Sequence, residues 1–147
     1  MENILFEAHR ENGDNAVLTN TQLGKRMPIH TTSGGKAILS EMADEVAESI
    51  LQRHGLSQIT ENTITGKDAL YNELQHIRNE GVSYNDQEYI DGLRAIAVPI
   101  TLPDGKVLGA IGLSGPSHRF KGELYQQELP DKLLGVANEI ELNLRYS

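Results

Sequence analysis

The chain has 147 residues, a length that suits one domain with its own apolar core. It contains no cysteine, which excludes a disulfide scaffold, and no apolar run that is long enough to span a bilayer. Its formal net charge is −8, and its 13 lysines and arginines are scattered, so we do not expect this chain alone to bind nucleic acid.

The first residues predict a β-hairpin. Moderate alternation of apolar and polar residues predicts strands over 3–10 and 15–22. Between them lies Asn12-Gly13, a dipeptide that favours a tight hairpin turn. Residues 27–30 are then predicted to be extended, because the residue before a proline avoids the helical region.

Three helices are predicted next. Thr32 or Ser33 is suitable as the N-cap of a short helix. A second helix is predicted over 43–55, and a third follows the capping-box residue Thr65 and ends at Gly81. The apolar faces predicted for the second and third helices are Val46, Ile50 and Leu51, and Leu70, Leu74 and Ile77.

A pair of antiparallel strands is predicted over 93–101 and 106–114. The residues between them include Pro103-Asp104-Gly105, a turn signal in which proline presets φ and glycine accepts a positive φ. Because the connection is short, the two strands are expected to be antiparallel neighbours.

The last segment, 119–146, is predicted to be helical but interrupted, because Pro130 suits only the first turn of a new helix. Its predicted apolar stripe consists of Leu133, Val136, Ala137, Ile140 and Leu144. Strands, helices, a further strand pair and a closing helix together predict an α+β fold with an antiparallel sheet.

Three segments carry longer motifs. The first reads GKRMPIHTTSGGKAIL (24–39) and the third reads LSGPSHRF (113–120). The second has its motif positions at Gly81, Asn85, Glu88, Ala95, Pro99 and Ile100. In order and spacing these segments resemble the effector-binding domain of IclR-family transcription regulators. The amino-acid sequence is similar to that of archaeal members of the family.

The resemblance implies a GAF-like (profilin-like) fold, which is a curved antiparallel sheet flanked by helices. Residues 1–147 would form one effector-binding domain that is incomplete at its N-terminus, and the family's DNA-binding winged helix-turn-helix would be absent from this chain. The protein would act on DNA only through that missing domain.

The resemblance also implies a pocket for a small-molecule metabolite effector, an acid or an aromatic compound. Free N–H groups at a helix start suit an acidic ligand, although an ordinary cap and core packing are the structural alternatives. The ligand-binding residues that we predict are Ser33, Gly34, Asn85, Leu93, Ala95, Ile111, Gly112 and Ser114.

Three of these positions depart from the family pattern. Asn85 stands where the family usually has Asp, Ala95 where oxo-acid binders often have Cys, and Gly112 where they often have Ser. A wider and less polar pocket is implied, so glyoxylate or pyruvate is not the expected effector. Glu88 matches the family signature, but the sequence leaves its role open between structure and ligand contact.

No cofactor or metal is expected, because the five histidines lack metal-ligand spacing. The resemblance implies a homodimer or homotetramer, and the absence of a signal peptide suggests a cytoplasmic protein without membrane contact. Two alternatives remain: a pure oligomerisation module with a non-functional pocket, and an acyl hydrolase. The hydrolase would use Ser33 and Lys36 as a Ser-x-x-Lys pair, but the companion Ser-Asp-Asn and Lys-Thr-Gly motifs are absent.

Overall fold

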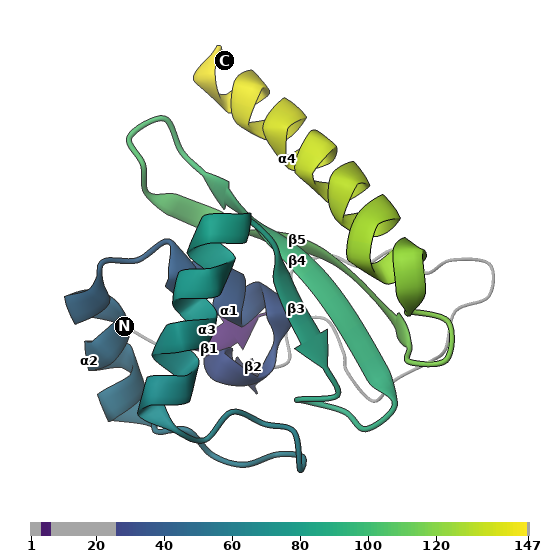
Figure 1. Ribbon diagram of the computed structural model, residues 1–147. Helices are drawn as coiled ribbons and strands as arrows, with labels where there is room; N and C mark the ends of the chain where they lie inside the picture. The colour runs from purple at the N-terminus through teal and green to yellow at the C-terminus, as the bar shows by residue number, and fades with distance from the viewer. Residues whose placement is uncertain (1–3, 7–25, 147) are drawn as a thin grey trace.

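The computed structural model describes residues 4–6 and 26–146 (Figure 1). The predicted strand over 15–22 and most of the one over 3–10 lie outside these residues. In chain order the elements are the strands β1 (Ile4–Phe6) and β2 (Arg26–Pro28), the 3-10 turn η1 (Ile29–Thr31), the helices α1 (Ser33–Ser40), α2 (Asp44–His54) and α3 (Lys67–Glu80), the strands β3 (Ser83–Asp86), β4 (Leu93–Thr101) and β5 (Val107–Pro116), the π-helical turn η2 (Leu124–Glu128) and the helix α4 (Leu129–Arg145).

The main sheet is antiparallel and has the strand order β3-β4-β5, while β1 pairs with β2 separately. Figure 1 shows α4 on one side of this sheet and α1 with α3 on the other side. The predicted α+β class with an antiparallel sheet is therefore confirmed. The strand β3, which the sequence did not predict, pairs with β4 along its whole length.

The predicted turn between β4 and β5 is confirmed. The Leu102 amide donates to the Lys106 carbonyl at 2.7 Å, and the Lys106 amide donates to Asp104 Oδ1 at 2.9 Å. Gly105 has a φ of 89°, a conformation that glycine adopts without steric cost. After this turn β5 runs to Pro116, two residues beyond the strand end that alternation predicts.

Two apolar clusters form, one on each side of the sheet. The first joins α1, α2 and α3 through Ile29, Leu39, Ala47, Ile50, Leu51, Leu70, Leu74 and Ile77. The second joins the sheet to η2 and α4 through Val82, Ile96, Val98, Ile100, Tyr125, Leu133 and Ala137. Ile96, Val98 and Ile100 of β4 all belong to the second cluster. β4 is the central strand because it pairs with both β3 and β5.

Two predicted apolar faces are corrected at single positions. Val46 of α2 is 50% exposed, and Ala47 takes its place beside Ile50 and Leu51. Val136 of α4 is 47% exposed, although the other members of its stripe are buried or packed against the second cluster. In both helices the buried stripe is narrower than the sequence pattern suggests, because only one neighbouring layer covers each helix.

Local hydrogen bonds correct two further predictions. The extended segment ends at Pro28, because the Thr31 hydroxyl donates to the Pro28 carbonyl at 2.7 Å and closes the turn η1. Helix α3 has Gly66 as its N-cap with no side-chain cap, so Thr65 does not form the predicted capping box. The N-cap of α1 is confirmed, since Thr32 Oγ1 accepts from the Gly35 amide at 3.0 Å.

Candidate functional site

The sheet register brings most of the predicted ligand-binding residues onto one face. Asn85 pairs with Ala95, and Ala95 pairs with Ser114, so the three form one row across the sheet. Directly paired residues project to the same face, and so do residues two apart along a strand. The face therefore also includes Leu93 and Gly112, with Gly112 and Ser114 exposed and Leu93 half-buried.

This face meets the start of α1. The Asn85 side-chain amide donates to the Thr31 carbonyl at 2.6 Å, just before the helix begins. Helix α1 packs on β4 and β5, and its first two residues are the predicted Ser33 and Gly34. Ser33 is buried and Gly34 is half-buried, so the first turn of α1 and the sheet row form the candidate site.

Ile111 is not part of this site. It pairs with Val98, and alternation places it on the opposite face from Gly112. Its side chain packs against the second apolar cluster, on the α4 side of the sheet. The prediction that Ile111 contacts a ligand beside Ser114 is therefore wrong, because residues 111 and 114 are three apart along the strand and project to opposite faces of the sheet.

Asn85 is buried and its side chain already has two partners. Only 4% of the residue is exposed, and its Oδ1 accepts from the Glu88 amide at 2.9 Å while its Nδ2 donates to Thr31. The side chain thus fastens the end of β3 to the turn before α1. Whether it also contacts an effector stays a prediction.

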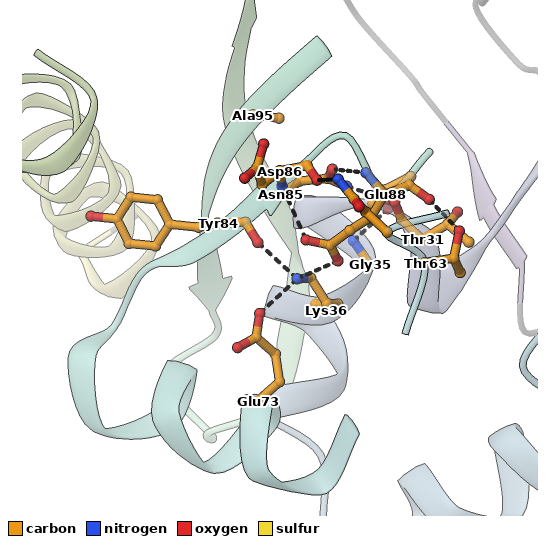
Figure 2. Close-up of polar contacts among 12 residues, drawn as sticks. Thr31, Gly35, Lys36, Thr63, Glu73, Tyr84, Asn85, Asp86, Glu88 and Ala95 are labelled. Carbon is orange, nitrogen blue, oxygen red and sulfur yellow. Dashed lines mark hydrogen bonds and ion pairs between the residues drawn. The ribbon is translucent and has the colours of Figure 1, made fainter. Parts of the chain in front are cut away.

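Lys36, which the sequence suggested only as the partner of Ser33 in the hydrolase alternative, lies beside the candidate site. It is fully buried, and its Nζ lies 2.8 Å from Glu73 Oε2, 2.8 Å from Glu88 Oε1 and 2.7 Å from the Tyr84 carbonyl (Figure 2). Glu88 is only 8% exposed, and its ion pair with Lys36 gives it a structural role. Lys36 donates to three acceptors, which argues against its serving as the base of a Ser33 nucleophile.

The loop between α2 and α3 holds the segment that follows β3. Thr63 Oγ1 donates to the Glu88 carbonyl at 2.7 Å, and Thr60 Oγ1 donates to the Gln87 carbonyl at 2.6 Å. The Asn62 side chain donates to the Asp86 carbonyl at 3.0 Å. The sequence shows this loop only as polar, because the residues that it contacts lie 24 to 27 residues away in the chain.

Tyr125 supports the same row from the opposite face of the sheet. Its hydroxyl donates to the Asn85 carbonyl at 3.2 Å and lies 3.4 Å from the Ala95 carbonyl. Arg94 lies over its ring and donates to Asp86 at 2.9 Å, which lowers the pKa of the Asp86 carboxyl. These contacts fix the backbone of the row without occupying its α1 side.

The described residues contain no group of three or more His, Cys, Asp or Glu side chains placed to hold a metal ion. A groove of about 370 Å³ lies between β4 and α4, and its lining includes Glu41, Thr101 and Glu141. It shares no residue with the candidate site. None of the helices in the described part of the chain is long and apolar enough to cross a bilayer.

Comparison with known proteins gives one consistent family. Residues 5–142 match the family described as "Bacterial transcriptional regulator IclR C-terminal". The chain is 38% identical over 98 residues to the HTH-type transcriptional repressor AllR of Escherichia coli K12, covering 67% of this chain and 36% of AllR. It is 33% identical over 126 residues to the HTH-type transcriptional regulator KdgR of Escherichia coli K12, covering 86% of this chain and 48% of KdgR.

A solved structure agrees with these relatives. The chain superposes with a TM-score of 0.77 and 30% identity on a double mutant of the PobR inducer-binding domain from Acinetobacter, in complex with 3-hydroxybenzoic acid. The match covers 88% of this chain and 74% of that one. The chain spans less than half the length of AllR and of KdgR, so its matches lie within one part of those regulators.

Proposed function

This chain belongs to the IclR family of transcriptional regulators, as a C-terminal domain, and we propose that it senses a small-molecule effector for a full-length regulator. The observation that carries the proposal is the row Asn85-Ala95-Ser114 on the sheet face beside the first turn of α1. Gly112 and Ser114 on this face are exposed to solvent and therefore accessible to a ligand.

The chemistry of the site favours an effector with an apolar body. Ala95 and Gly112 supply no side-chain polar group, and Ser114 contributes one hydroxyl. The PobR domain carries 3-hydroxybenzoic acid in its solved complex, which makes aromatic acids the first compounds to test on this chain. Backbone N–H groups in the first turn of α1 would receive the carboxylate.

Sensing would work by linkage and would require no chemical step. An effector that prefers one arrangement of the segments around the site shifts the protein toward that arrangement. A coupling of about 1–3 kcal/mol to the DNA-binding domain would be sufficient for a regulatory switch. That domain would lie outside the present residues, and the regulator would act in the cytoplasm as a homodimer or homotetramer.

A thermal-shift screen tests the proposal. The panel contains oxo-acids, sugar acids, acyl metabolites and aromatic acids, including 3-hydroxybenzoic acid. A compound at 100 times its Kd stabilises the folded state by about 2.7 kcal/mol, which corresponds to a rise of several degrees in Tm. We expect Ser114→Ala to weaken this response and Ala95→Leu to abolish it, because the larger side chain fills the row.

Ser117→Ala is the matched control, since it removes a hydroxyl three residues further along the chain and outside the row. An equal loss of response in Ser117→Ala would argue against the assigned site. A folded oligomer that responds to none of the compounds would favour the alternative, a pure oligomerisation module with a non-functional pocket.

A further inference from the structure

Lys36 is the centre of a buried ion triad that joins three elements. Its ammonium group comes from the second turn of α1, Glu88 follows β3, and Glu73 projects from α3 (Figure 2). The Lys36 side chain has no exposed surface, and the exposed fractions of the carboxylate side chains are 10% for Glu88 and 29% for Glu73. The triad therefore extends from the interior of the candidate site to the surface of α3.

The contacts of this triad satisfy the buried cation. An ammonium group has three N–H donors, and Lys36 directs them to two carboxylates and the Tyr84 carbonyl. A buried charge persists only when it is paired and hydrogen-bonded in this way. All three N–H donors of Lys36 are thus used within the protein, which argues against a role as counter-ion of an acidic effector.

The triad also closes a ring around the candidate site. Glu88 Oε2 accepts from the Asp86 amide at 3.0 Å, and the Glu88 amide donates to Asn85 Oδ1. Asn85 then donates to the Thr31 carbonyl, and five residues later the chain returns to Lys36. The ring encloses the N-cap of α1, so the first turn of the helix cannot move without changing the geometry at Lys36.

We infer that Lys36 is a positioning residue for the proposed effector site, and that Glu73 couples the state of that site to α3. The inference rests on the proposed function, since it assigns the regulation of the same site. Displacement of the first turn of α1 by an effector would change the distance from Lys36 to Glu73. Helix α3 would then carry the signal to the molecular surface.

Amide hydrogen exchange, measured residue by residue by NMR without any ligand, tests this coupling. The variant is Glu73→Gln, which keeps the size of the side chain and removes its charge on α3. The reporters lie on the other two elements: the Gly35 amide, bonded to Thr32, and the Asp86 and Glu88 amides, bonded within the ring. We expect their exchange to rise roughly tenfold, as for the loss of one charge-assisted hydrogen bond.

Glu48→Gln is the matched control, because Glu48 pairs with Lys67 of the same helix α3 at 2.6 Å but both side chains are exposed. The amide of Ile96, which is buried in the centre of the sheet, reports any general loss of stability. A rise confined to the ring amides in Glu73→Gln, and absent in Glu48→Gln, supports the inference. Unchanged ring amides in Glu73→Gln would overturn it.

A second variant covers the case in which Glu73→Gln does not fold. In Glu88→Gln the perturbation begins inside the ring, and the α3 amides around Glu73 become the reporters, with the same tenfold expectation. Unchanged α3 amides there would equally overturn the coupling. Because neither measurement uses an effector, failure of the ligand screen and failure of this inference are separate results.

Discussion

At the residue scale, His30 shows how burial controls a titratable group beside the site. It is 2% exposed, and its Nε2 lies 2.9 Å from the Ser57 carbonyl. Burial lowers the pKa of His30 below its usual 6.5, while the bond to Ser57 and the charge of Glu88 act in the opposite direction. The neutral ring is therefore the form that fits the folded protein.

This lowered pKa predicts a loss of stability in acid. Because the folded state holds the proton less tightly than the unfolded chain, the contribution of His30 is present above about pH 6.5 and is lost as the pH falls toward the folded pKa. Each tenfold difference in proton affinity corresponds to about 1.4 kcal/mol. Urea denaturation at pH 7.5 and pH 5 should show a smaller pH dependence in His30→Gln than in the wild type.

The control for this measurement is His54→Gln, which removes an exposed histidine at the end of α2. Its stability should follow the pH dependence of the wild-type protein. If His30→Gln kept the full wild-type difference between the two pH values, His30 would not be the group responsible.

At the scale of an element, α4 has a glycine in its helical interior, whereas α3 has a glycine at its C-cap in the left-handed conformation. Gly135 lies in the interior of α4 and is exposed, and a Cβ added there would meet no atom within 4 Å apart from its chain neighbours and the nearby backbone of its own helix. Gly81 is the C-cap of α3 in the left-handed region, with a φ of 80°. The first glycine weakens its helix, whereas the second allows its helix to end.

The same substitution should therefore have opposite effects at these two positions. Gly135→Ala should raise the free energy of unfolding by about 0.5–1 kcal/mol, because alanine loses less backbone entropy in a helix. Gly81→Ala should lower it by about 1–2 kcal/mol, the cost of the left-handed conformation for a residue with a Cβ. Urea denaturation of both variants measures the two changes, and changes of the same sign would contradict the assigned conformations.

At the scale of the whole molecule, one sheet separates two apolar clusters. Ile77 belongs to the cluster under α1, α2 and α3, and Ile100 belongs to the cluster under α4. Both side chains are almost fully buried. Since the sheet stands between the clusters, they should respond to mutation independently.

Ile77→Val and Ile100→Val should each lower the free energy of unfolding by about 0.5–1.5 kcal/mol. The double variant should show the sum of the two losses within about 0.5 kcal/mol, as for sites that share no contacts. Equilibrium urea denaturation of the four proteins measures this. A larger deviation from the sum would mean that the two sides of the sheet are packed as one core.

The amino-acid sequence by itself determined the local features. The Thr32 cap, the turn at Asp104-Gly105, the apolar face of α3 and the pairing of β4 with β5 were all predictable, because each depends on residues close together in the chain. The longer motifs also identified the family, which the comparisons confirmed. The alternation rule, applied strictly, would have excluded Ile111 from the site.

Only the tertiary structure decided the partners of the buried polar groups. Lys36 bonds to carboxylates 37 and 52 residues away, and Asn85 bonds to a carbonyl 54 residues away. Periodicity and propensity record which face of an element is apolar, but they carry no information about which distant element will cover that face. The burial of Glu88 and the solvent exposure of Ser114 follow from that packing, and so they appear only once the chain is folded.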